Sequence, residues 1–225
     1  MNKTTVLSTP LTSRRRTLQS AGSLAAGALL ATVPGLGNAR ITADSPSAPL
    51  PATPAGPVGP FYPQAFSASP TASLLPPGAA SQATVLLSGR LTDPAGRPLT
   101  AVRIEIWQCD SFGRYHHSRD SDPEDRDPGF LGFGWQTTDA QGHYRFTTIV
   151  PPPYPGRTPH IHLAIISNTT SAVTQTFATQ IYLPAEQQRN RADSLYRSLG
   201  DKAGLSTATR QADQLRFDLV MRHQG

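Results

Sequence analysis

Cysteine is almost absent from this sequence of 225 residues, in which Cys109 is the single thiol. A disulfide needs a pair of cysteines, and a CxxC zinc site or a cysteine-ligated iron–sulfur cluster needs several thiolates. One thiol per chain excludes all three. Any metal bound by this chain must therefore be held by oxygen and nitrogen donors.

Acidic residues are missing from the first 39 positions, which carry Lys3 and the run Arg14–Arg16. The whole chain has a formal charge of +5, and setting these four cations aside leaves +1 for residues 40–225. A nucleic-acid-binding protein is expected to carry its basic residues on the folded domain. The charge distribution therefore argues against a nucleic-acid partner.

The basic leader, residues 1–39, has the order of parts found in an export signal. Its arginines precede an apolar run, Ala21–Val33, and the small residues Gly37 and Ala39 follow where a signal peptidase would cut. The segment resembles a twin-arginine signal, so we expect export to the periplasm or the extracellular space. The run is shorter than the roughly 20 residues of a membrane span, so no stable span is expected. A disordered basic tail is the alternative.

Long hydrophobic runs are also lacking after the leader. Residues 40–83 are rich in Pro, Ala and Ser and show no sustained periodicity, which predicts an extended arm. Within the arm, the stretch from Gly59 to Pro63 is an apolar aromatic cluster stiffened by proline, and we expect it to dock on the folded domain. Residues 84–225 form that domain, without an internal repeat or a second core.

The pattern from residue 84 onward predicts short strands, because apolar and polar residues alternate between turn residues. Four strands are interpreted as two hairpins, 85–87 with 102–107 and 134–138 with 144–148. Further along, the pattern predicts strands over 160–166, 174–183 and 215–221 and a helix over 186–199. Many short strands with turns between them predict an all-β fold, an antiparallel β-sandwich with a Pro-rich N-terminal arm and a short C-terminal helix.

His160 and His162 stand two residues apart at the start of a predicted strand. Side chains at i and i+2 of a strand point to the same face, so both imidazoles can lie on one side of the sheet while Ile161 packs on the other. This arrangement can bind a metal through two nitrogens. Histidines also satisfy buried backbone groups, so a structural role stays open at this point.

Two tyrosines and an arginine accompany these histidines. Tyr154 and Arg157 lie in the Pro-rich loop before the strand, and Tyr115 follows Gly-Arg after an earlier strand. In this order the residues resemble the intradiol ring-cleavage dioxygenases, particularly those similar to protocatechuate 3,4-dioxygenase. That pattern has a Tyr after Gly-Arg, a second Tyr before Pro, and an Arg shortly before His-x-His. The resemblance covers about residues 59–182.

The resemblance implies a transthyretin-like sandwich that binds one non-haem Fe(III) per chain. The implied iron ligands are Tyr115, Tyr154, His160 and His162. Tyr154 would also serve as the base for one substrate proton, and Arg157 would stabilise negative charge on the substrate ring. The implied partners are a small catechol-type substrate and O2, converted to a cis,cis-muconate-type diacid. Assembly into a homo-oligomer stays open.

Four further residues are implied to lie near the substrate: Gln180, Phe61, Tyr62 and Gly156. A structural role within its strand stays open for Gln180, and so does simple anchoring of the arm for the two arm aromatics. Gly156 stands where some members carry a bulky aromatic, which predicts a wider pocket. Arg114 is a conceivable partner for a substrate carboxylate, or it faces solvent.

The chemistry of the donors independently favours ferric iron. A phenol with an ordinary pKa of about 10 becomes an anion at neutral pH only beside a strongly acidic cation. Two phenolates with two imidazoles suit Fe(III) better than copper(I), and zinc sites seldom use tyrosinate. Two alternatives remain: a non-catalytic secreted transthyretin-like binding module, and a copper enzyme that uses His160 and His162.

Overall fold

A computed structural model describes residues 48–64, 69–79, 83–169 and 172–222. All of them belong to one compact unit, Asp44–Gly225. The predicted export signal lies outside the described residues, and so do parts of the arm. Within these ranges no helix is both long and apolar enough to cross a membrane.

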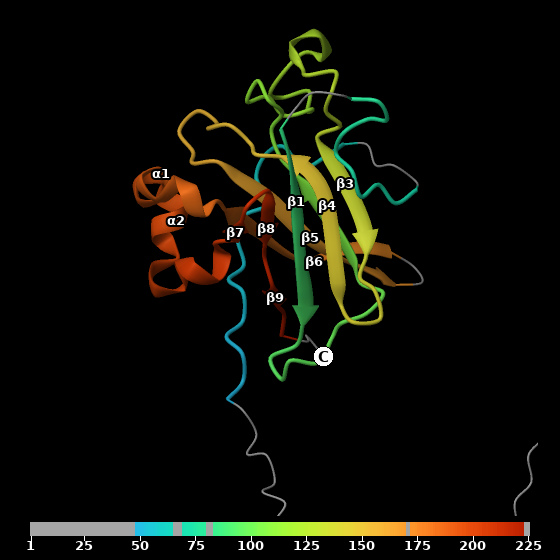
Figure 1. Ribbon diagram of the computed structural model, residues 1–225, viewed down its shortest axis with the longest axis vertical. Helices are drawn as coiled ribbons and strands as arrows, with labels where there is room; N and C mark the ends of the chain where they lie inside the picture. The colour runs from blue at the N-terminus through green and yellow to red at the C-terminus, as the bar shows by residue number, and fades with distance from the viewer. Residues whose placement is uncertain (1–47, 65–68, 80–82, 170–171, 223–225) are drawn as a thin grey trace, which may run out of the picture. The chain divides into compact units, whose positions relative to one another are not determined.

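The described strands form two sheets (Figure 1). The first has the order β4 (His143–Ile149), β1 (Thr84–Thr92), β8 (Gln214–Arg216), β7 (Thr209–Gln211), and β9 (Leu219–Val220) also pairs with β1. The second has the order β3 (Phe133–Thr137), β2 (Arg103–Trp107), β5 (His160–Thr169), β6 (Ala172–Tyr182). The second sheet is antiparallel throughout, whereas β8 and β9 run parallel to β1. The all-β class is therefore confirmed, and the transthyretin-like type of sandwich stays a prediction.

The main core lies between the sheets. Strands of both sheets supply buried apolar side chains to it, among them Leu87, Phe146, Ile104, Ile106 and Leu163. Burying a side chain of this size is worth about 1.5–3 kcal/mol. The opposite face of the second sheet carries a separate cluster that includes Trp107, Tyr115 and Ala164, and residues of the arm pack on it. Because β5 alternates between these faces, His160 and His162 lie on the arm side.

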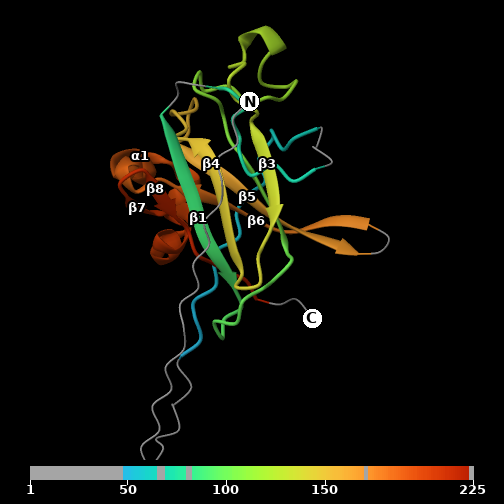
Figure 2. The same cartoon turned by 45° about the vertical axis from the view of Figure 1, so that its right-hand side comes forward.

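Both predicted hairpins are wrong. Strands β1 and β2 belong to different sheets, and so do β3 and β4, so each turn carries the chain from one layer to the other. Strand β1 pairs with β4, and β2 pairs with β3 and β5. Alternation reveals which face of a strand is buried but not which strand lies beside it. Strands β5 and β6, at the positions predicted over 160–166 and 174–183, pair antiparallel in a hairpin that projects past the other strands in Figure 2.

The single helix predicted over 186–199 is divided. The structure has a 3-10 turn at Pro184–Glu186, α1 at Gln187–Ala192, α2 at Ser194–Ser198 and a further 3-10 segment at Gly200–Ser206. Asp193 interrupts the helix because its backbone is extended and its side chain caps α2. The strand predicted over 215–221 is likewise divided into β8 and β9. One other 3-10 turn occurs at Pro123–Asp125.

The arm runs across the outer face of the second sheet without helix or strand in residues 48–64. Backbone N–H groups of Thr53 and Gly56 donate to the carbonyls of Val220, at 2.9 Å, and Ala178, at 2.8 Å. Further on, Thr71 forms a bridge with Trp135 of β3. These contacts dock the arm on the domain and place the Gly59–Pro63 cluster over the histidines of β5.

Candidate metal centre

His160 and His162 face each other on the arm side of β5. Their Nε2 atoms are 3.2 Å apart, and the two side chains are 3% and 4% exposed. Burial lowers the pKa of His160 to about 4 and lowers the pKa of His162 well below its usual value. Both rings are therefore neutral near pH 7, and their lone pairs can be shared with a cation.

Neighbouring groups fix both rings. Nδ1 of His160 lies 2.7 Å from the carbonyl oxygen of Thr158, so it carries the proton and leaves Nε2 as an acceptor. The ring of His162 stacks on Trp107, with centroids 4.8 Å apart and planes inclined by 8°. Two bare nitrogens at this separation repel unless a proton or a cation lies between them. The pair thus fits one edge of a metal site.

The two tyrosines lie beside this pair. The Tyr115 ring is 5.6 Å from that of Tyr154 and 6.0 Å from that of His162, centroid to centroid. Tyr115 is buried, whereas Tyr154 is half-buried. Burial raises the pKa of both phenols, so neither ionises near neutral pH without a strong cation. The structure therefore brings together all four candidate ligands, and the donor set suits a hard trivalent ion.

Histidine and carboxylate ligands by themselves do not make this site. Within the described ranges, no group of three or more His, Cys, Asp and Glu side chains is placed to hold a metal. Tyr115 and Tyr154 are nearby side chains that offer oxygen donors to a cation on the two histidines.

The loop that carries Tyr115 is held by carboxylates that the sequence analysis did not identify as part of the site. Oδ2 of Asp120 accepts a 2.6 Å hydrogen bond from the Tyr115 backbone N–H. Oδ1 of Asp110, which is fully buried, accepts 2.9 Å bonds from the N–H groups of Phe112 and Arg114. These bonds set the loop geometry and so direct the Tyr115 side chain toward the histidines.

Arg157 lies on the loop that precedes β5 and contacts two side chains. Its Nε donates to Oδ2 of Asp193 at 2.7 Å, and its Nη2 donates to Oε1 of Gln180 at 2.5 Å. Gln180 is directly opposite His162 on β6 and also accepts a hydrogen bond from Tyr182 at 3.1 Å. The predicted Arg157 and Gln180 thus form one network at the edge of the ligand cluster.

The arm residues take different positions. Phe61 lies against the candidate ligands, with ring centroids 4.9 Å from Tyr115 and 5.8 Å from Tyr154. Tyr62 lies one ring further away, packed edge-on against Trp107 at 4.9 Å. Its hydroxyl donates to the buried carboxylate of Glu105 at 2.5 Å, and burial together with this bond raises the pKa of Tyr62. Of the two, Phe61 is placed to touch a ligand bound at the cluster.

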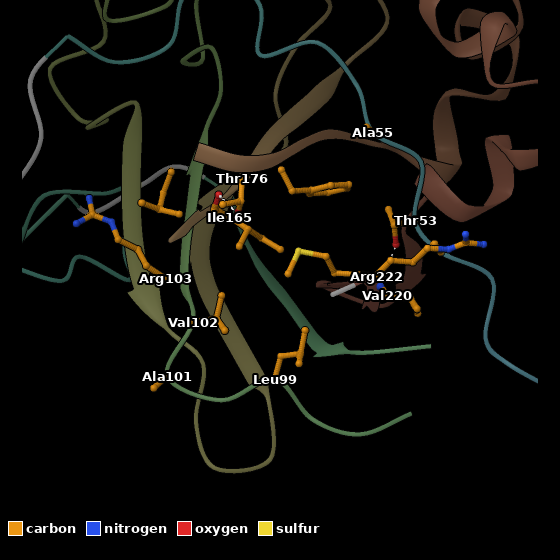
Figure 3. A pocket seen from close by; sticks show the side chains of 14 residues that line it. Thr53, Ala55, Leu99, Ala101, Val102, Arg103, Ile165, Thr176, Val220 and Arg222 are labelled. Atoms are coloured by element: carbon orange, nitrogen blue, oxygen red, sulfur yellow. Dashed lines mark hydrogen bonds between the residues drawn. The ribbon is translucent and has the colours of Figure 1, made fainter. Parts of the chain in front are cut away.

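Gly156 lies two residues after Tyr154, and the wider pocket that the sequence predicts at this position stays a prediction. Gly156 is exposed, its φ is +76°, and a Cβ at this position would meet no atom within 4 Å. A cavity of about 430 Å³ adjoins the cluster and is lined in part by Phe61, Trp107 and Tyr115. A separate cavity of about 580 Å³ is lined by Leu99, Val102 and Ile165 among others, and none of the four candidate ligands reaches it (Figure 3).

Gly59 allows the arm to approach His162 closely. Its φ is +80°, and a Cβ there would lie 3.0 Å from Cε1 of the His162 ring. Gly78 has nearly the same φ of +81°, but a Cβ added to it would meet no atom within 4 Å, so it serves as a matched control. Gly78→Ala should cost about 1–2 kcal/mol, the cost of a left-handed conformation. Gly59→Ala should cost about 1–3 kcal/mol more because of the collision.

Chemical denaturation and iron titration of both variants measure these effects. Gly59→Ala should also weaken iron binding, because the His162 ring must move, whereas Gly78→Ala should bind iron like the wild type. Equal stability losses with unchanged iron binding in both variants would show that the arm does not constrain His162.

The comparisons with known proteins agree with this geometry. The family described as "Dioxygenase" (Dioxygenase_C) matches residues 58–223. The chain is 37% identical over 109 residues to the protocatechuate 3,4-dioxygenase beta chain of Burkholderia cepacia, covering 45% of each chain. It is 30% identical over 137 residues to the hydroxyquinol 1,2-dioxygenase of Corynebacterium glutamicum, covering 53% of this chain and 42% of that protein. The aligned parts thus span less than half the length of these two relatives.

Solved structures show the same relationship. The dioxygenase domain of a dioxygenase carbohydrate-binding protein fusion from Streptomyces sp. SirexAA-E is 30% identical, with a TM-score of 0.59, covering 76% of this chain and 99% of that chain. An intradiol ring-cleavage dioxygenase from Tetranychus urticae shares the fold, with a TM-score of 0.61 at 19% identity, covering 78% of this chain and 96% of that chain. The chain is thus an all-β protein of two sheets that brings two tyrosines and two histidines together as candidate metal ligands. The chain belongs to the intradiol dioxygenase family.

Proposed function

We propose that the protein binds one non-haem Fe(III) through Tyr115, Tyr154, His160 and His162 and cleaves a catechol-type ring between its two hydroxylated carbons. Both atoms of O2 enter the product, a cis,cis-muconate-type diacid. The observation that carries this proposal is the convergence of two buried neutral imidazoles and two phenols from separate segments. When bound, ferric iron supplies the Lewis acidity that ionises phenols and diols near neutral pH.

The chain's own residues then have distinct tasks. Tyr154 is half-buried on the loop before β5, so it can leave the cluster and accept one diol proton at its Oη. Tyr115 is buried beneath Phe61 and stays in place. Arg157 carries a permanent charge at the edge of the cluster and stabilises negative charge that develops on the substrate ring.

The remaining expectations extend this proposal. Phe61 and Gln180 lie beside the diol, Tyr62 supports this side of the pocket through Trp107, and Gly156 admits ring substituents. The relatives include separate alpha and beta chains of protocatechuate 3,4-dioxygenase, which supports assembly of several subunits, here a homo-oligomer. The leader, residues 1–39, directs export through a twin-arginine pathway, followed by the arm, residues 40–83, and the catalytic domain, residues 84–225.

A visible absorption spectrum of the purified protein, with iron quantified in the same sample, tests the proposal. Tyrosinate bound to ferric iron should give a charge-transfer band, which should shift on anaerobic addition of catechol or protocatechuate and bleach when O2 is admitted. The double variant His160→Ala/His162→Ala should show neither iron nor band. A wild-type protein that stays colourless after iron reconstitution would contradict the proposal and favour a non-catalytic binding module.

A further inference from the structure

The two carboxylate oxygens of Asp193 accept hydrogen bonds from different segments, one from helix α2 and the other from the loop that carries Arg157. Oδ1 accepts hydrogen bonds from the N–H groups of Leu195, at 2.9 Å, and Tyr196, at 3.0 Å, and so caps α2. Oδ2 accepts from Nε of Arg157 at 2.7 Å and from the N–H of Thr158 at 3.0 Å. One side chain therefore joins the helical segment to the loop that leads into β5.

The guanidinium of Arg157 is held at two points by this arrangement. Nε is bound by Asp193, and Nη2 is bound by Gln180, which Tyr182 holds in turn. Because the guanidinium is planar, two contacts at different nitrogens define both its position and the orientation of its plane. Without Asp193 the guanidinium would keep one anchor and could rotate about it.

Burial distinguishes this ion pair from a surface pair. The Asp193 side chain is 0% exposed and that of Arg157 is 19% exposed, whereas Arg216 and Asp218 are 61% and 49% exposed. Burial by itself would raise the pKa of Asp193, but the hydrogen bonds from Arg157 and from backbone N–H groups outweigh it and lower the pKa. A surface pair like Arg216–Asp218 contributes little to rigidity, while a buried carboxylate constrains its partner strongly.

We propose that Asp193 is a positioning residue that orients the Arg157 guanidinium toward the substrate ring and couples helix α2 to the site. The proposal rests on the function proposed above for the cluster. It assigns a role to a residue that the motif does not contain and that lies 36 positions from Arg157 along the chain.

Cap-preserving variants separate the two tasks of Asp193. Asn and Ser cap helices about as well as Asp, so Asp193→Asn and Asp193→Ser should keep α2 while removing the carboxylate from Arg157. Asp193→Ala should lose both the helix cap and the contact with Arg157, and it should melt at a lower temperature than Asp193→Asn or Asp193→Ser. Asp218→Asn is the matched control, because Asp218 also pairs with an arginine and accepts a backbone N–H, from Arg90 at 3.0 Å.

Iron-free protein gives a readout that does not depend on activity. In ¹H–¹⁵N spectra the Nε–H of Arg157, assigned by its loss in Arg157→Lys, should exchange slowly with solvent in the wild type and in Asp218→Asn. In Asp193→Asn and Asp193→Ser it should exchange at least about tenfold faster, because its acceptor is gone. Unchanged protection in both Asp193 variants would overturn the proposal.

A double-mutant cycle on the iron-loaded protein completes the test. Asp193→Asn should lower kcat on the preferred diol about 10- to 100-fold with less than about a threefold change in KM, as expected when a catalytic group is misaligned. In an Arg157→Ala background the same change should alter kcat less than about twofold. Equal losses in both backgrounds, or full kcat in Asp193→Asn, would overturn this inference alone. Absence of turnover in the wild type would overturn the proposed function, and this inference with it.

Discussion

Replacing Tyr115 with Phe should remove most of the iron and the visible band while leaving the fold intact. The change deletes one oxygen from a ring that is 3% exposed and keeps its packing against Phe61 at 4.9 Å. Losing a ligand should weaken iron binding by at least about a hundredfold, since even residues behind the ligands cost 10- to 100-fold. Iron analysis and absorption spectra after equilibration with a competing chelator measure the effect.

Tyr144→Phe is the control for this variant. Tyr144 is equally buried, but its hydroxyl donates to the Phe217 carbonyl in the core between the sheets, apart from the cluster that holds Tyr115. It should lower stability somewhat and leave iron content and colour unchanged. If Tyr115→Phe kept wild-type iron, band and turnover, then Tyr115 would not be a ligand.

Arg157→Ala should retain iron and diol binding but lower kcat about 10²- to 10³-fold, the usual effect of removing one group that stabilises developing charge. It should also destabilise the protein by about 3–5 kcal/mol, because the buried Asp193 carboxylate loses its partner. Steady-state kinetics, spectral titration with diol under anaerobic conditions and thermal melting separate the three quantities. Arg216→Ala, which breaks an exposed pair, should leave all of them close to wild type.

Arg157→Lys tests whether the charge alone is sufficient. Lysine keeps the positive charge but lacks the planar guanidinium whose nitrogens contact Asp193 and Gln180 at the same time. We expect a kcat between those of the wild type and Arg157→Ala. Undiminished turnover in Arg157→Ala would remove the residue from the reaction and leave it a purely structural role.

Part of the site could be predicted because it depends on local geometry. Strand alternation alone places His160 and His162 on one face, and the structure confirms it with Nε2 atoms 3.2 Å apart. The motif order also identified Tyr115, Tyr154 and Arg157. Trp107 could not be found in this way, since it stacks on His162 only because β2 pairs with β5 in the register that sets them opposite each other.

Most strand positions, the docking segment of the arm and the order of the candidate ligands could be predicted, because these follow from periodicity, proline content and residue chemistry within short segments. The short strand β7 and the division of residues 215–221 into β8 and β9 were not predicted. The strand partners, the split of the C-terminal helix at Asp193 and the network through Gln180 emerged from the three-dimensional structure. Those features arise from contacts between residues distant in the chain. The free energy of such contacts depends on which sheet each strand joins and in which register it pairs, and the local pattern of apolar and polar residues does not specify either.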